Sequence, residues 1–324
     1  MKPKVLVTGG SGFLGSALVK RLLTDGYDVS VLDDNSRGSA SRLEAVVDDI
    51  KFIQGDVRDS DVVDKAVKDV EWVYHLAFIN GTRFFYEKPG SILDVGIRGA
   101  LNTMDSAQKY GIDKYILASS SEVYQEPEKI PTDENERAII PDVKNPRFSY
   151  GGGKLISELL AFHYLKNVNT KIIFRPHNVY GPNMGWEHVV PDLMRKVRVI
   201  SQENNSSSLD FPIQGNGSET RAFCFIDDAT DGIIKLSEKG KDNEIFHLGT
   251  NQEISISNLV QLIGKITGFN LRIQSSAAPE GGTPRRCPNI SKLSKLGYNP
   301  SVTLNEGLKH CWRWYSEAEL PLEK

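Results

Sequence analysis

The chain has 324 residues, of which 39% are hydrophobic and 25% charged, and its formal net charge is -3. These values are typical of a folded protein with enough length for one large and one smaller domain. The near-neutral charge gives no general attraction to nucleic acid or to an anionic membrane, so neither is expected as a partner. The three cysteines lack metal-ligand spacing, and no apolar run reaches membrane-spanning length. We therefore expect a reduced, cytoplasmic protein without a metal site.

Short β-branched segments alternate with helix-like segments in the first half of the chain. We expect strands at 4–8, 28–32, 51–55, 72–76, 114–119 and 171–175, and helices at 13–23, 91–110 and 153–165. This alternation predicts an α/β fold of the Rossmann type, a doubly wound parallel sheet with helices on both faces. A smaller C-terminal α/β lobe is expected to follow, with helices at 190–199, 256–266 and 304–315 and a polar loop at 201–208.

A glycine-rich turn follows the first expected strand and opens the first expected helix. Gly9, Gly12 and Gly15 recur there at every third position. Such glycines allow a tight turn, close approach of a pyrophosphate and close helix–strand packing, although a glycine turn without a ligand has the same local pattern. Asp33 ends the second expected strand, where a carboxylate would accept ribose hydroxyls and repel a 2′-phosphate. The pattern predicts a dinucleotide site that prefers NAD, while Arg37 close by would also suit NADP.

Tyr150 and Lys154 are four residues apart, so a helix would place them on one face. A nearby ammonium favours the phenolate and lowers the tyrosine pKa, which prepares the tyrosine for proton transfer. An ordinary surface pair has the same spacing. The glycines at 151–153 cost about 1 kcal/mol each in a helix, so they indicate close packing or a delayed helix start. The serines at 119–121 end the fifth expected strand, at the sheet edge where such folds place their chemistry.

Successive motifs of the chain resemble those of the extended short-chain dehydrogenase/reductases, in particular the NAD-dependent nucleotide-sugar epimerases, dehydratases and decarboxylases. The resemblance runs from Lys4 to Tyr315. It implies NAD as the cofactor and a nucleotide-diphosphate sugar as the substrate. It also implies that residues 1–178 bind NAD, that a segment near 223–247 returns to that domain, and that 179–324 bind the nucleotide sugar. The matching segments are residues 8–15, 33–35, 55–59, 75–77, 120–122, 150–154, 175–182, 215–223 and 284–289.

The resemblance also implies roles for individual residues. Ser120 would hydrogen-bond the reacting sugar hydroxyl, Tyr150 would exchange its proton, and Lys154 would also hold the nicotinamide ribose. The cofactor contacts implied are Gly9, Gly12, Phe13, Leu14, Gly15, Asp33, Asn35, Arg37, Asp56, Val57, Leu76, Ala77, Phe78, Tyr150, Lys154 and Pro176. The substrate contacts implied are Ser120, Ser121, Asn178, Arg221 and Arg286, with Arg285 as the alternative to Arg286.

Two positions depart from the family pattern. Gly96 stands where the family often has asparagine, and Phe78 stands where a second small residue is usual. Both departures concern the identity of the substrate rather than the fold. His177 would lie near the nicotinamide or would be a structural histidine, and the sequence leaves both readings open.

The favoured function is C4 epimerisation through a transient 4-keto sugar, as in UDP-glucose and UDP-glucuronate 4-epimerases. A UDP-glucuronate-type decarboxylase is the alternative, because Ser121-Glu122 matches its Ser-Glu pair. A dehydratase would more often carry Asp-Glu there. Glu122 would serve a second proton transfer or act as a fixed carboxylate at the strand end. A non-catalytic NAD-binding redox sensor is disfavoured by the intact Ser120, Tyr150 and Lys154. The resemblance further implies a homodimer built on the helices near 91–110 and 153–165.

Overall fold

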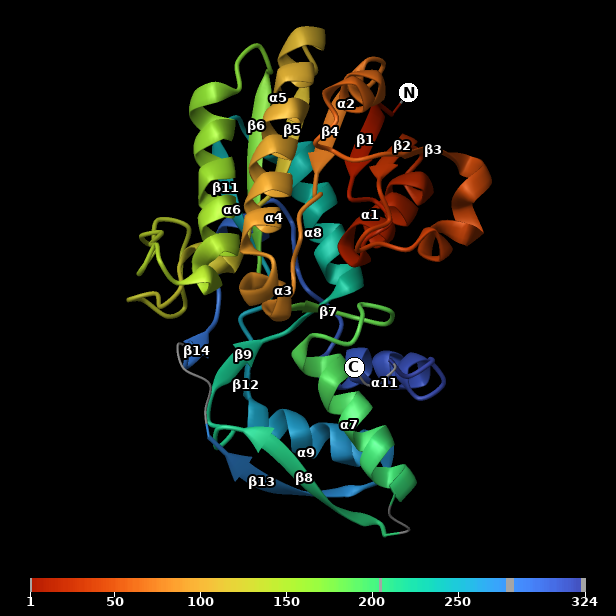
Figure 1. The fold of residues 1–324 in the computed structure, drawn as a ribbon, viewed down its shortest axis with the longest axis vertical. Coiled ribbons are helices and arrows are strands. Elements are labelled where there is room, and N and C mark those ends of the chain that lie inside the picture. The colour runs from red at the N-terminus through yellow and green to blue at the C-terminus, as the bar shows by residue number, and fades with distance from the viewer. Residues whose placement is uncertain (1, 204–205, 278–282, 322–324) are drawn as a thin grey trace.

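The computed structural model describes residues 2–203, 206–277 and 283–321. Its largest feature is a sheet of 7 strands in the order β11-β6-β5-β4-β1-β2-β3, in which all neighbours are parallel (Figure 1). This sheet confirms the predicted Rossmann-type doubly wound architecture. The strands are β1 (Lys4–Thr8), β2 (Asp28–Asp33), β3 (Ile50–Gln54), β4 (Trp72–His75), β5 (Lys114–Ala118), β6 (Thr170–Pro176) and β11 (Glu244–Leu248).

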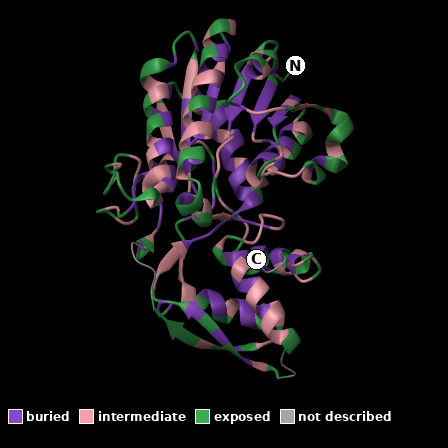
Figure 2. Cartoon of the chain, in the orientation of Figure 1, coloured by how far each residue is buried: buried purple, intermediate pink, exposed green. Residues whose placement is uncertain are grey.

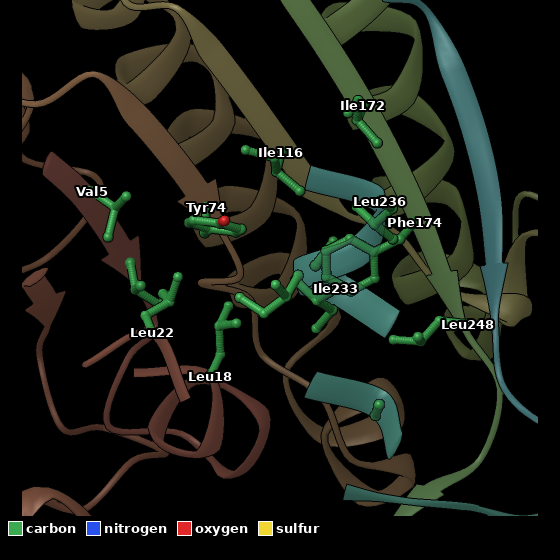
Figure 3. Packing of buried hydrophobic residues seen from close by; sticks show 14 of the residues in the cluster. Val5, Leu18, Leu22, Tyr74, Ile116, Ile172, Phe174, Ile233, Leu236 and Leu248 are labelled. Atoms are coloured by element: carbon green, nitrogen blue, oxygen red, sulfur yellow. The ribbon is translucent and has the colours of Figure 1, made fainter. Parts of the chain in front are cut away.

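Helices cover both faces of this sheet, because its strands carry continuous runs of apolar side chains that point alternately to the two faces. Val5 and Val7 pack on the face covered by α1 (Phe13–Thr24) and α8 (Ile226–Lys239), as Figure 3 shows for ten labelled residues of this cluster. Leu6 points to the opposite face. That face is covered by α2 (Ser60–Val67), α5 (Gly99–Tyr110) and the segment that follows α6 (Ser149–Leu159). The inner strands β1, β4 and β5 are therefore almost entirely buried, whereas the edge strand β3 is only half-buried or exposed (Figure 2).

Two predicted helices differ from expectation near the candidate site. The helix expected at 91–110 consists of α4 (Pro89–Leu93), a π-helical turn at Asp94–Arg98, and α5. The helix expected at 153–165 begins four residues earlier, at Ser149, and ends in a π-helical turn at Leu160–Tyr164. The glycines at 151–153 therefore lie inside α6 and do not delay its start.

After β6 the chain builds a second part with its own apolar core, seen below the sheet in Figure 1. The predicted bounds of the polar loop at 201–208 are wrong at both ends, because α7 continues to Glu203 and β8 begins at Ser208. Residues 204–205 lie outside the described residues. The chain then returns through α8 and β11 to the large sheet. The second part contains α7 (Val189–Glu203), α9 (Ile256–Thr267), α11 (Leu304–Tyr315), β7 (Val179–Tyr180), β8 (Ser208–Gln214), β9 (Thr220–Ala222), β10 (Cys224–Phe225), β12 (Glu253–Ser255), β13 (Asn270–Ser276) and β14 (Arg285–Arg286).

Several short elements were not anticipated from the sequence. They are 3-10 segments at Ala40–Asp49, Ser121–Val123 and Pro146–Phe148, and the helices α3 (Thr82–Glu87) and α10 (Ser291–Ser294). Cys224, Cys287 and Cys311 are buried and free. Within the described ranges, no helix combines the length and apolarity needed to cross a bilayer.

Candidate active site

The glycine turn between β1 and α1 forms one wall of a cavity at the carboxyl end of the sheet. Gly9 has φ +71°, and a Cβ on it would lie 2.8 Å from the backbone N of Ala77. A Cβ on Gly15 would lie 2.1 Å from the carbonyl oxygen of Gly9. These positions accept only glycine because backbone segments approach so closely. No side chain caps α1 at Gly12, so its first N–H groups are available to phosphates.

The implied cofactor residues surround this cavity, with one exception. Asn35 does not line it; its backbone N donates to Asp33 Oδ1 in a turn with φ +58°. The sequence did not single out Ser36, Gly38, Arg42 and Asn80, which also line the cavity. The implied residues that do line it are Gly9, Gly12, Phe13, Leu14, Gly15, Asp33, Arg37, Asp56, Val57, Leu76, Ala77, Phe78, Tyr150, Lys154 and Pro176.

Asp33 and Arg37 lie in this cavity wall in different electrostatic settings. The Asp33 carboxylate is buried, and its Oδ2 accepts a hydrogen bond of 2.9 Å from the backbone N of Ser11. Arg37 donates to Glu187 Oε2 at 2.9 Å. The charge of Arg37 is thus balanced by Glu187, whereas the Asp33 carboxylate remains at the end of β2. This arrangement suits a ribose with free hydroxyls better than one with a 2′-phosphate.

The predicted Tyr150–Lys154 pair lies at the end of the same cavity. Both side chains are buried, and Lys154 Nζ donates to the carbonyl oxygen of Ala118 at 2.6 Å. Burial lowers the pKa of Lys154 to about 7. Burial also raises the pKa of Tyr150, while a hydrogen bond with Ser120 acts in the opposite direction. The expectation that Lys154 lowers the tyrosine pKa is not met in this structure, because desolvation dominates and the ammonium is directed to Ala118.

Ser120 lies two residues after the end of β5, beside Tyr150. Its Oγ accepts from the backbone N of Glu122 at 3.1 Å, so the hydroxyl also caps the short turn after β5. The neighbouring Ser119 donates instead to Glu158, which forms a buried ion pair with Arg175. That ion pair connects β6 with α6. The pair could not be predicted from the sequence, because Arg175 begins the matching segment 175–182 but no motif includes Glu158.

Glu122 is held by an arginine from the other end of the chain. Arg286 Nη1 donates to Glu122 Oε1 at 2.7 Å, and the positive charge of Arg286 lowers the pKa of Glu122 against the effect of its burial. Arg285 is instead exposed and bonds Glu253 on the surface. The structure therefore places Arg286, rather than Arg285, beside Glu122.

Two further arginines surround Glu122. Arg221 donates to the carbonyl oxygens of Thr220 and Thr283, each at 2.7 Å, and burial together with the charge of Arg286 lowers its pKa to about 10. Arg147 comes three residues before Tyr150, and its Nε is buried without a hydrogen-bond partner among the described residues. The charge of Arg147 also lowers the pKa of Glu122. Three arginines facing one carboxylate leave an excess of positive charge, which suits an anionic ligand.

The sequence did not point to Arg147. Its spacing before Tyr150 was visible, but only the 3-10 turn at Pro146–Phe148 brings its side chain to Glu122. The expected substrate contacts do not line the glycine-turn cavity; they are Ser120, Ser121, Asn178, Arg221 and Arg286. The contact between Tyr150 and Ser120 connects these residues with the residues that line the cavity.

Asn178 and His177 follow β6. Asn178 has φ +43°, and its amide donates to the carbonyl oxygen of Ala222 at 3.3 Å. His177 is buried and packs against the ring of His247 at 4.6 Å, without lining the cavity. Burial lowers the pKa of His177 well below its usual value, so the ring is neutral. The structure thus gives His177 a packing position.

Comparison with known proteins identifies the family. The family model described as "NAD dependent epimerase/dehydratase family" matches residues 5–249. The chain belongs to this family. The glycine turn, the Asp33 carboxylate and the buried Lys154 around one cavity fit the NAD that the family uses. Among the described residues, no cluster of three or more His, Cys, Asp or Glu side chains is arranged to hold a metal ion.

Relatives within the family catalyse different reactions. The chain is 33% identical to a Methanocaldococcus jannaschii protein named "Putative UDP-glucose 4-epimerase", over 96% of this chain and 97% of that one. It is 29% identical to the UDP-N-acetyl-alpha-D-glucosaminuronate decarboxylase of Bacillus cytotoxicus, over 98% and 99% of the two chains. The UDP-glucuronic acid 4-epimerase of Bacillus cereus, solved with UDP-glucuronic acid and NAD, superposes with a TM-score of 0.85 at 26% identity, covering 97% and 99%. The chain is therefore an NAD-dependent enzyme of the epimerase/dehydratase family.

Proposed function

We propose that the enzyme inverts C4 of a nucleotide sugar through a transient 4-keto sugar and keeps its NAD throughout. The observation that carries this proposal is that Glu122, the second carboxyl group of the site, is already bound to Arg286 as an ionised carboxylate. Epimerisation requires no second acid, because the keto sugar only has to present its other face. Relatives that are named C4 epimerases support the same reading.

The cofactor and the side chains would divide the chemistry between them. NAD, when bound, would supply a hydride acceptor and return the same hydride. Tyr150 would take the proton of the C4 hydroxyl and later return it. Ser120, which already bonds Tyr150, would hold the sugar oxygen. Lys154 would contribute positive charge beside Tyr150 and bond the nicotinamide ribose.

The nucleotide end would be held by the positive cluster. We propose that Arg221 and Arg286 bind the diphosphate, together with Asn178, and that Arg147 adds to the positive potential there. Arginine suits a diphosphate because its guanidinium offers several donors in one plane. The implied domain division follows as a proposal: 1–178 with the returning segment 223–247 would bind NAD, and 179–324 would bind the nucleotide sugar.

Decarboxylation is the second candidate. It is favoured by the Ser121-Glu122 pair and by the decarboxylase among the relatives. That reaction also begins with oxidation at C4, but its second step reprotonates carbon. A dehydratase needs an acid for the leaving hydroxyl, and an ionised Glu122 beside Arg286 is poorly suited to that task. A redox sensor without activity is disfavoured by the arrangement of Ser120, Tyr150 and Lys154.

We also propose a cytoplasmic homodimer that pairs α5 and α6 across a two-fold axis. Ile156 and Leu159 on α6 are 39% and 52% exposed, which is unusual for large apolar side chains within one helix. Tyr164, in the following turn, is 41% exposed. A second copy of the same helices would cover all three.

The deciding experiment is incubation of the purified protein with a panel of UDP- and dTDP-sugars, with the products identified by NMR. The panel includes glucose, N-acetylglucosamine, glucuronate and N-acetylglucosaminuronate derivatives. A C4 epimer as the product supports the proposal. Release of CO₂ from a uronate, or a stable 4-keto-6-deoxy sugar, would replace it with the second candidate or a dehydratase.

A further inference from the structure

One aromatic ring touches both reactive side chains of the site. Lys154 Nζ lies 4.1 Å from the centroid of the Phe78 ring. The Tyr150 ring meets Phe78 edge to face, at 5.3 Å between centroids and 87° between planes. Phe78 itself follows β4 and lines the cavity of the glycine turn. A single side chain therefore contacts the proton-transfer group and its cationic neighbour.

Two glycines on different helical segments provide the room for this ring. A Cβ on Gly96 would lie 2.2 Å from Phe78 Cζ, and a Cβ on Gly153 would lie 3.0 Å from the same atom. Gly96 belongs to the π-helical turn at Asp94–Arg98, and Gly153 belongs to α6. The tip of the ring therefore occupies a slot between these two segments, and a side chain at position 96 would exclude it.

A second ring restrains Tyr150 from another direction. Phe85 in α3 stacks on Tyr150, with 5.1 Å between centroids and 17° between planes. Phe78 and Phe85 belong, with Tyr150, to one small apolar cluster. The Tyr150 ring thus has an aromatic ring edge-on and another parallel to it, an arrangement that restricts its rotation.

The Phe78 ring also compensates for the burial of a charge. Lys154 forms no ion pair within the part of the chain that the structure describes, and the hydrogen bond of its ammonium goes to a backbone carbonyl. A buried ammonium is costly without a partner. The face of an aromatic ring attracts such a cation, more strongly when both are shielded from water.

We propose that Phe78 is a positioning residue: its face holds the Lys154 ammonium, its perpendicular contact restrains the Tyr150 ring, and Gly96 and Gly153 are small in order to admit it. This inference rests on the proposed role of Tyr150 and Lys154 in proton transfer. An aliphatic side chain could fill the same space, but it has no negative ring face for the ammonium.

The test is a set of four variants: Phe78→Leu, Gly96→Ala, the double variant Phe78→Leu/Gly96→Ala, and Gly152→Ala as the matched control. Gly152 lies in the same glycine run, but a Cβ there would meet only Ile140 Cδ1, at 3.4 Å. For each protein we would measure the melting temperature, kcat and KM, and the pH dependence of kcat and of NAD affinity. NAD affinity is read by calorimetry and does not depend on turnover.

We expect Gly96→Ala to lower the melting temperature, because the new methyl group would overlap the Phe78 ring. Phe78→Leu should lower kcat about tenfold with little change in KM for the sugar, and should move the alkaline limb of both pH profiles down by about half to one unit. The direction follows because the ring stabilises charged Lys154, so its loss lowers the pKa of that lysine. Gly152→Ala should behave as wild type.

The double variant separates positioning from space filling. The smaller leucine makes room for the alanine methyl group, so the melting temperature should recover while kcat and the alkaline limb stay at the Phe78→Leu values. Recovery of kcat and of the pH profile together with the melting temperature would show that the ring only fills space. A wild-type protein without activity towards any nucleotide sugar would refute the proposed function. The role of Phe78 is tested separately: it is refuted if the pH dependence of NAD affinity is the same in Phe78→Leu as in the wild type.

Discussion

Arg286 and Glu122 form an ion pair with 2.7 Å between Nη1 and Oε1, although they are 164 residues apart in the chain. The pair joins β14 of the second part to the turn after β5. It keeps the carboxyl group ionised, since the charge of Arg286 lowers its pKa. Its contribution to stability is present above the ordinary glutamate pKa and is lost as the pH falls through the lowered value. At neutral pH Glu122 is therefore a fixed anion rather than a proton donor.

Asp33→Ala should weaken NAD binding roughly tenfold to a hundredfold and reduce the preference for NAD over NADP. The carboxylate is placed for the ribose hydroxyls and also accepts from the backbone N of Ser11, so its loss loosens the glycine turn as well. Calorimetric affinities for both dinucleotides check this. Asp34→Ala is the control, because its carboxylate bonds the backbone of Ser36 locally, and a smaller effect is expected. Tighter binding of NADP than NAD by the wild type would contradict the assignment.

Tyr150→Phe should lower kcat by about 10² to 10⁴-fold, the usual contribution of a general acid–base group. The buried ring and its contacts with Phe78 and Phe85 are retained, so the melting temperature and NAD affinity should change little. Steady-state kinetics and calorimetry measure the two effects separately. Turnover at the wild-type rate would remove Tyr150 from the reaction.

Lys154→Met should abolish most of the activity and weaken NAD binding, yet stabilise the folded chain. Burial lowers the pKa of Lys154 from 10.5 to about 7, so the charged lysine opposes folding below pH 7. This cost shrinks as the pH rises from about 7 to 10.5, because the folded state there holds Lys154 neutral while the unfolded chain still binds the proton. The melting temperature of the variant should exceed that of the wild type at pH 6, and the difference should narrow by pH 9. An equal or lower melting temperature at pH 6 would contradict this.

The large sheet and the cofactor cavity could be predicted from the sequence because their signals are local. Parallel strands buried on both faces give continuous apolar runs, and Gly9 and Gly15 are required by contacts within a few residues or one neighbouring strand. Tyr150 and Lys154 are likewise fixed by helical spacing alone. β11 lies beside β6 at one edge of the large sheet, although it follows β7 to β10 of the second part in the chain.

The contacts that define the rest of the site join distant segments and leave no local pattern. The charge of Arg147 acts on Glu122 from a short turn before α6, and Arg175 of β6 forms its ion pair with Glu158 of α6. Phe78 and Gly96 could each be recognised in the sequence as a departure from the family pattern. The sequence could not show that the Phe78 ring fills the space left by the missing side chain at Gly96. Asn35, an expected cofactor contact, lies in the turn after Asp33 and does not line the cavity, and its place in that turn could not be seen from the sequence.

Leu159→Glu should convert the proposed dimer to a monomer at micromolar concentration. The change places a charge on the exposed apolar face of α6, where a second copy would bury it without a partner. Light scattering gives the mass of wild type and variant. Val143→Glu is the matched control, because Val143 is 89% exposed and lies outside α5 and α6. A monomeric wild type would rule out the dimer directly.

Glu122→Gln separates the proposed epimerase from the decarboxylase and the dehydratase. In the proposed scheme all three reactions would begin with loss of the C4 hydroxyl proton to Tyr150. Only the latter two require a further proton transfer at the 4-keto stage. Glu122, whose backbone N donates to Ser120 Oγ, is the candidate carboxylate for that step. If the enzyme is an epimerase, the variant should lose less than about tenfold in kcat, since the change removes a charge from the arginine cluster but no proton-transfer group.

The product of that variant gives the sharper answer. An epimerase variant still forms the C4 epimer, and its bound cofactor returns to the oxidised state after each turnover. A decarboxylase or dehydratase variant would instead accumulate reduced cofactor, visible by its absorbance, and would release neither CO₂ nor a 4-keto-6-deoxy sugar. Glu122→Asp is the control: it keeps the charge for Arg286 but shortens the reach, so it should preserve the ion-pair stability at neutral pH. The epimerase proposal would be overturned if Glu122→Gln accumulates reduced cofactor while Glu122→Asp keeps the stability of the wild type. That result would show that Glu122 acts in a second step.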